Sequence, residues 1–353
     1  MPVATLVATV PAWPDLGPAD PPAVLSWGRR TLVMQRGDTE VAVRDLAGQQ
    51  PERRFPAPWP RRYGSVTVSP AGDLAVFAGV HALRALDANG VLRWELRHGC
   101  WSAAWCTVNH ATFAEYAEDD DHSFADHGSA AFSPDGERVW AHVRDYADDE
   151  IDEQWMVVDA ADGTVLGRTA TMTAGSFSAH FPHPDPAYMG LTVGEGDEDS
   201  PVLWGHWDGR TLTAGRYVEK VFLAVAPSGG HFLTADPGQW SLHLHRATDG
   251  TRLRLLDAET AVPPATGGGR VRWDLEAAFP WDDVAVAGTE DDAGAPRHWL
   301  VDLVTMTVRG PVTYPVPVAG PARSAGPGLW CTISPGDAAV HLWTLTGGGC
   351  GPA

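Results

Sequence analysis

The side chains best suited to chemistry gather in one segment, residues 99–128, where indoles, thiols, imidazoles and carboxylates lie close in sequence. A helix-like stretch near 107–117 precedes a run of acids in this segment. Carboxylates attract basic partners or divalent cations, and indoles in a loop can form a binding surface. The candidate binding residues here are Trp101, Trp105, Asp119, Asp120, Asp121, His122 and His127.

The same segment contains metal-ligating residue types without a spacing that identifies a metal. Calcium loops place carboxylates at alternate positions with a glycine for the turn, and the run at 119–122 has neither feature. Zinc requires three or four ligands at suitable spacing, which His98, Cys100, Cys106 and His110 only suggest. Such cysteines are more often small buried residues. We therefore assign no metal ligand and no cofactor.

Linear signatures of catalysis are missing from the sequence. It contains no Gly-x-Ser-x-Gly elbow, phosphate loop, dinucleotide fingerprint or His-Glu-x-x-His motif. We assign no catalytic residue. An active site assembled from single residues on separate repeats would leave no such motif, so an enzyme remains an open alternative.

A repeated pair of turns organises the elements that must position these side chains. A short apolar run ends at a residue-Pro turn, as at Ser69 and Ser133, and an Asp-Gly-rich turn follows at a similar distance. Proline sets φ for the first turn position, and Asp or Gly tolerates the tighter geometry that follows. Each unit is then expected to hold four short strands, and a unit of ~40–45 residues is the period of a propeller blade. The anchors of the seven units lie near residues 26, 69, 133, 183, 226, 279 and 324.

The last unit has only three strands before the sequence ends, whereas the N-terminus begins with an unassigned β-type run at 3–10. Placing that run as the missing fourth strand closes the ring without an open edge. The predicted fold is therefore all-β: a single seven-bladed β-propeller over residues 1–353, closed by its N-terminal strand. Segment 99–128 is an insertion between the second and third blades.

These repeats resemble those of a known family. The Ser-Pro turns at Ser69 and Ser133, together with the strand at 340–345, are similar to WD40 and YVTN propeller repeats. The resemblance covers essentially the whole chain and implies the propeller fold. Because propellers serve as scaffolds, receptors and enzymes, it does not imply one activity.

Charge and topology together suggest a partner. The chain has 45 acidic and 25 basic residues, a net charge of −20. In a propeller, the loops between second and third strands lie on the same face as the connections between blades, so their acids should join those of 99–128. The loop residues that we add to the candidate binding set are Asp148, Asp149, Asp197, Asp199 and Asp291. Such a face would attract a protein with a basic surface, although solvated hairpin tips would look the same.

The composition also excludes classes of partner and location. Nucleic acid and anionic lipid both require a basic surface, so we expect neither as a partner. The sequence has no convincing signal peptide, membrane-spanning run or disulfide framework, and we expect a cytoplasmic monomer. The predicted function is a non-catalytic interaction or scaffold protein that uses its acidic face. The alternative is an enzyme or small-molecule binder with its site at the channel mouth beneath 99–128.

Overall fold

The computed structural model consists almost entirely of β-strands. It describes residues 1–28, 30–48, 51–102, 106–122, 126–147, 150–196, 201–217, 220–264, 270–290, 297–334, 336 and 339–345. These ranges contain 28 strands, and the helical elements among them are short: α1 (Ala258–Ala261) and the 3₁₀ turns η1 (Arg61–Tyr63), η2 (Phe113–Glu115) and η3 (Asp120–His122). No helix in the described ranges has the length and apolar character needed to cross a bilayer.

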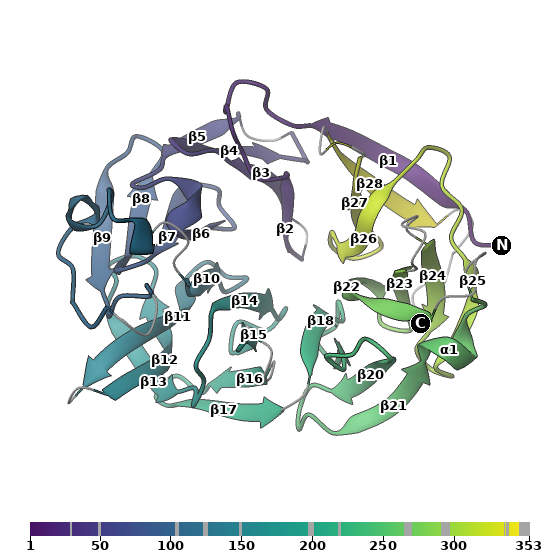
Figure 1. Cartoon of the computed structure of the whole chain (residues 1–353). Helices are drawn as coiled ribbons and strands as arrows, with labels where there is room; N and C mark the ends of the chain where they lie inside the picture. Colours follow the sequence, from purple (N-terminus) through teal and green to yellow (C-terminus); the bar gives the residue numbers. More distant parts are fainter. Residues whose placement is uncertain are drawn as a thin grey trace. The chain divides into compact units, whose positions relative to one another are not determined.

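The strands form seven four-stranded antiparallel sheets, labelled in Figure 1. The first blade contains β2 (Ala23–Trp27), β3 (Arg30–Arg36), β4 (Glu40–Asp45) and β5 (Arg53–Pro56). The second contains β6 (Gly64–Val68), β7 (Leu74–Gly79), β8 (Ala82–Asp87) and β9 (Leu92–Arg97). The third contains β10 (Ser129–Phe132), β11 (Arg138–Ala147), β12 (Glu150–Asp159) and β13 (Val165–Ala170).

The remaining four blades follow the same plan. The fourth contains β14 (Phe177–Pro182), β15 (Tyr188–Gly194), β16 (Val202–Trp207) and β17 (Leu212–Tyr217). The fifth contains β18 (Val221–Val225), β19 (His231–Ala235), β20 (Ser241–Arg246) and β21 (Arg252–Asp257). The sixth contains β22 (Arg272–Trp281), β23 (Val284–Glu290), β24 (Arg297–Asp302) and β25 (Thr307–Pro311). The seventh contains β26 (Ala319–Ser324), β27 (Trp330–Ile333), β28 (Ala339–Leu345) and β1 (Ala4–Pro11).

The seventh blade takes its outer strand from the opposite end of the chain. β1 pairs antiparallel with β28, in a register that runs from Ala4 opposite Leu345 to Pro11 opposite Ala339. The prediction of an all-β propeller with seven four-stranded blades, the last completed by the N-terminal strand, is therefore confirmed.

The chain divides into two compact units. The first contains Met1–Ala12, Pro21–Val33 and Val221–Ala353, and the second contains Trp13–Asp20 and Met34–Lys220. The fifth, sixth and seventh blades belong to the first unit, and the second, third and fourth belong to the second. The insertion at 99–128 lies wholly in the second unit.

Turn chemistry explains why the Ser-Pro phrase recurs at the end of a first strand. The Ser69 hydroxyl accepts the backbone N–H groups of Asp73 (3.1 Å) and Leu74 (3.2 Å) and donates to the Asp73 carboxylate (2.7 Å). Ser133 similarly accepts the N–H of Arg138 (3.1 Å). One side chain thus satisfies backbone donors that the tight turn leaves unpaired, which fixes the hairpin register.

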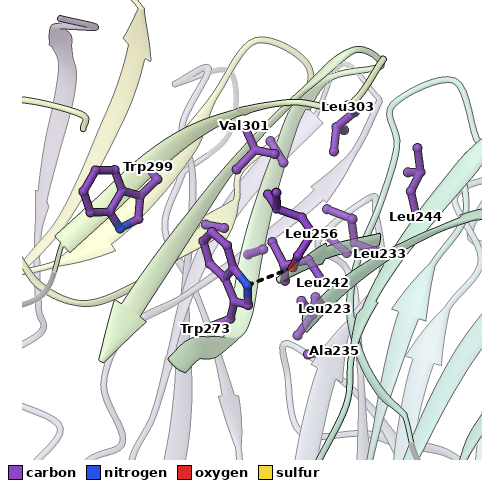
Figure 2. Close-up of a cluster of buried hydrophobic side chains, with 14 of the residues drawn as sticks. Leu223, Leu233, Ala235, Leu242, Leu244, Leu256, Trp273, Trp299, Val301 and Leu303 are labelled. Carbon is purple, nitrogen blue, oxygen red and sulfur yellow. Dashed lines mark hydrogen bonds between the residues drawn. The ribbon is translucent and has the colours of Figure 1, made fainter. Parts of the chain in front are cut away.

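Burial differs systematically across a blade. Every residue of β15 except Tyr188 is buried, whereas β17 and β13 are largely half-buried or exposed. The inner strands are covered by neighbouring sheets on both faces, so their sequences are nearly continuous apolar runs. In the first unit, the core of the fifth and sixth blades is the clearest case: Trp273 projects from β22 among leucines, and its indole N–H donates to the Leu256 carbonyl (3.2 Å; Figure 2).

Candidate functional site

The insertion connects β9 to β10 as an irregular segment with two 3₁₀ turns. The helix expected near 107–117 is reduced to η2. Thr112 and Glu115 form a capping box around that turn: each side chain accepts the backbone N–H of the other residue. The reciprocal bonds satisfy two backbone donors of one short turn, and a hydrogen-bonded turn from Tyr116 to Asp119 follows it.

A buried indole anchors the start of the insertion. Trp101 is 1% exposed, and the Arg144 guanidinium of β11 lies 4.5 Å from its ring centroid. Arg144 also donates to the Trp101 carbonyl (3.1 Å), and the Gly99 N–H donates to the Arg144 carbonyl (2.9 Å). A desolvated cation–π contact of this type contributes about 2 kcal/mol or more. The insertion is therefore attached to the third blade.

Arg144 belongs to a buried charge network. Its Nε lies 3.4 Å from the Glu153 carboxylate, and its Nη2 donates to the Gly175 carbonyl (2.8 Å). The other Glu153 oxygen lies 3.3 Å from His142 Nε2. Burial alone would raise the pKa of Glu153, but His142, a Thr173 hydroxyl and the Arg144 charge together hold that pKa below its ordinary value. The carboxylate is thus ionised and fully partnered.

Two thiols and two imidazoles come together beside this anchor. One ligand atom from each of Cys100, Cys106, His110 and His122 lies within 4.8 Å of the others. The Cys106 Sγ is 3.4 Å from His110 Nε2, and the Cys100 Sγ accepts the Ser102 N–H (3.3 Å). All but Cys106, which is half-buried, are buried. Burial raises the pKa of the Cys100 thiol to about 12.

Each imidazole of this cluster has a carboxylate on its outer side. His110 Nδ1 lies 3.3 Å from Glu115, and His122 Nδ1 lies 3.0 Å from Asp119. The carboxylates are positioned in turn: Glu115 accepts the N–H groups of Ala111 and Thr112, and Asp119 accepts that of Asp121. Both rings therefore turn Nε2 away from the carboxylates.

Tyr116 fills the space around the imidazoles. Its ring stacks on His122 at 5.0 Å and lies tilted against His110 at 4.9 Å. Its hydroxyl is 2.6 Å from His81 Nδ1, and the side chain is 1% exposed. The inner side of the insertion is thus a packed aromatic layer.

The structure brings together only part of the candidate set. Trp101 and His122 are buried, Asp119 and Asp121 are exposed, and Asp120 lies in η3. His127 is half-buried, with Nδ1 2.9 Å from the Gly128 carbonyl. The candidates that lie outside the described residues are Trp105, Asp148, Asp149, Asp197, Asp199 and Asp291.

From sequence, Cys100, Cys106 and His110 had no assigned role, and His122 was not grouped with them. His98, considered with them, instead has Nδ1 2.8 Å from the Gly99 carbonyl and is not in the cluster. His122 lies twelve residues after His110 in the sequence, and η2 and the turn that follows it lie between the two. Only the folded path of those turns brings the two imidazoles together.

Open clefts lie elsewhere in the blades. One of about 480 Å³ lies among the turns of the second and third blades, at the sheet ends opposite the insertion, and Asp73, Asp87, Arg93 and Glu137 contribute to its lining. Beneath the insertion, by contrast, Trp101 and Tyr116 occupy the interior.

Comparisons with known proteins bear on the fold. No protein-family model matches this sequence, and no curated protein matches it. Among solved structures, the β-propeller domain of Cps50 (Swd1) from Myceliophteria thermophila is 10% identical, with 81% of this chain and 97% of that chain covered and a TM-score of 0.38. BBS1N in complex with ARL6DN is 9% identical over 98% of this chain and 96% of that chain, with a TM-score of 0.50. The dihydro-heme d1 dehydrogenase NirN in complex with DHE is 17% identical over 90% of this chain, with a TM-score of 0.50.

These likenesses establish architecture alone. This chain spans 63% of the NirN chain but nearly all of the BBS1N chain. The resemblance to WD40-type propellers therefore holds at the level of the fold, which is that of a seven-bladed propeller.

Proposed function

We propose that this protein is a non-catalytic, cytoplasmic propeller that binds a partner protein with a basic surface through the insertion at 99–128. The observation that carries the proposal is the charge of that segment: it has six Asp or Glu residues and no Lys or Arg. Of its described side chains, Glu115, Glu118, Asp119 and Asp121 are exposed.

Buried contacts on the inner side anchor the described part of the insertion. Trp101 and Tyr116 are buried beneath it, and Arg144 fixes its first residues to β11. Carboxylates on an ordered support lose little freedom when a partner docks, which lowers the entropic cost of binding. Their like charge would also steer a basic protein toward this surface and be screened by salt.

The solved structure of BBS1N in complex with ARL6DN supports the general possibility, since it is a protein of this fold crystallised with a partner. At 9% identity it offers no basis for choosing the same partner or surface here. The proposal rests on the charge of the insertion, and the test must address that charge.

The test compares three full-length proteins as bait in native lysate at low and high salt. Glu118→Gln with Asp121→Asn removes two exposed charges of the insertion, while Glu137→Gln with Glu259→Gln removes two exposed charges elsewhere. We expect one protein to be retained by the unmodified chain and the second variant, lost from the first, and released by salt. A partner retained equally by all three would overturn the proposal and direct attention to the cleft near Arg93.

A further inference from the structure

We propose that Cys100, Cys106, His110 and His122 are the four ligands of a structural zinc ion. Zinc bonds of about 2.3 Å to sulfur and 2.0–2.1 Å to nitrogen, arranged tetrahedrally, place ligand atoms about 3.3–3.8 Å apart. The pair of Cys106 Sγ and His110 Nε2, at 3.4 Å, already has that separation. All four ligand atoms lie within 4.8 Å of one another. The widest separation must therefore shorten by about 1 Å to reach the zinc-bound range, which rotation of the side chains can supply.

The second observation is an orphaned ring nitrogen. His122 is 4% exposed, and its Nε2 is buried with no hydrogen-bond partner among the described residues. A buried polar atom without a partner costs about 1–3 kcal/mol, so such an atom in a native protein requires an explanation. Because Asp119 holds the opposite nitrogen, Nε2 is the atom that His122 contributes to the cluster.

The outer carboxylates fit the same interpretation. A metal-bound histidine usually donates its other N–H to a carboxylate or carbonyl, which fixes the tautomer and makes the ligating nitrogen more basic. Glu115 and Asp119 occupy that position for His110 and His122 respectively. Two carboxylates of the insertion would therefore orient zinc ligands, a role distinct from the attraction of a partner protein.

The ligand types select the metal. Two thiolates with two imidazoles in a tetrahedral arrangement are typical of zinc, whereas calcium and magnesium prefer oxygen ligands. Binding replaces the two thiol protons, which pass to solvent, so the four side chains and Zn²⁺ together are neutral. Four protein ligands leave no open position, which indicates a structural rather than a catalytic ion.

The position of the ligands explains what the ion would accomplish. Cys100 follows the end of β9, and His122 lies in η3 near the far end of the insertion. One ion would therefore join the start of the insertion to its last described turn. This conclusion is independent of the proposed function, because an insertion ordered by zinc need not bind a protein.

The experiment measures metal content and coordination in the full-length protein, purified under reducing conditions, loaded with zinc and dialysed. We expect about one zinc ion per chain by elemental analysis and native mass spectrometry. Cobalt substituted for zinc should give the visible absorption of a tetrahedral thiolate–imidazole site. Cys106→Ser and His122→Gln should each abolish tight binding, whereas the control Cys331→Ser, which changes a buried thiol of β27, should retain it.

A fourth variant separates a ligand role from a folding role. Asp119→Asn leaves all four ligands in place and weakens the orientation of His122, so zinc affinity should fall by roughly 10–100-fold while the cobalt spectrum keeps its form. Chelation of the unmodified protein should lower its melting temperature, and zinc should restore it. A folded unmodified protein that binds no zinc, or a mass lower by two hydrogens that reveals a Cys100–Cys106 disulfide, would overturn the proposal. So would zinc retained by both ligand variants.

Discussion

The core of the fifth and sixth blades and the base of the insertion are stabilised by opposite means. The first is built from leucine, valine and alanine around Trp273, with the indole hydrogen bond to Leu256 at its centre (Figure 2). The second buries Glu153 and Arg144 and satisfies each with specific partners. An apolar core tolerates variation as long as volume and pattern persist, whereas a buried charge fails when one partner is lost.

The largest loss of stability is expected from Trp273→Ala. The side chain is fully buried, so truncation removes its transfer free energy and leaves a cavity among the leucines. Changes of this type cost about 3–5 kcal/mol, measured by denaturant unfolding. Leu255→Ala on β21 is the matched control, because Leu255 is 47% exposed. This substitution should lower the free energy of unfolding by no more than about 0.5 kcal/mol. Equal effects of the two changes would mean that this apolar core is not what holds the blades.

The buried ion pair at the base of the insertion is tested by Glu153→Gln, which should lower the free energy of unfolding by about 3 kcal/mol. This value is at the lower end of the range for breaking a buried ion pair, because the amide keeps the shape of the carboxylate and loses its charge. Arg144 would remain buried with weakened compensation. The control is Asp145→Asn on the neighbouring strand β11, which removes a solvent-accessible charge 3.6 Å from Arg168 and should cost less than about 1 kcal/mol of unfolding free energy. If Glu153→Gln unfolded at the same denaturant concentration as the unmodified protein, the contrast between the two regions would fail.

A buried neutral histidine in the first unit should make the folding stability fall in acid. His298 is 2% exposed, and burial lowers its pKa to about 4, against the opposing hydrogen bond to Gly320. An unfolded histidine takes up a proton below about pH 6.5, whereas the native ring stays neutral, so folding stability falls as pH drops through this window. The loss should be about 2 kcal/mol at pH 5 relative to neutral pH.

The test is the difference in unfolding free energy between the unmodified protein and His298→Gln, followed from neutral pH to pH 5. The unfolding free energy of the variant should depend less steeply on pH, because the contribution of His298 is removed while those of all other groups remain. In the unmodified protein, the Tyr314 hydroxyl lies 2.7 Å from the His298 Nδ1. Parallel curves for the two proteins would show that His298 is protonated in the native state.

The blades were predictable because similar turns recur along the chain, most clearly in the second and third blades. Ser69 and Ser133 mark turns whose hydroxyls satisfy backbone donors, and a pattern set by such short-range bonds is visible in sequence. The place of β1 followed from counting strands and avoiding an open edge. Prediction thus succeeded for the repeated turns and for the strand that completes the last blade.

The cluster of the insertion was not predictable on those terms. Cys100 and His122 are brought together by an irregular path that includes two 3₁₀ turns, and the helix expected near 107–117 did not form. Trp101 was proposed as a binding surface from its place in a loop, yet it is buried beneath Arg144. Contacts between distant parts of one irregular segment leave no periodic signal.

The smallest effect is expected at Thr112, whose side chain caps η2. Thr112→Ala removes the side-chain acceptor for the Glu115 N–H and leaves the Thr112 carbonyl (3.3 Å), while Thr112→Ser keeps a hydroxyl. Loss of a cap costs about 0.5–2 kcal/mol, and on a turn this short we expect a value near the lower limit. Because Glu115 also positions His110, amide hydrogen exchange at 113–116 should accelerate in Thr112→Ala and remain unchanged in Thr112→Ser.

If zinc holds His110 from the other side, the acceleration should be larger in chelated than in zinc-loaded protein. Equal acceleration in both would mean that the turn is ordered by its cap alone, as the blades are ordered by their own turns.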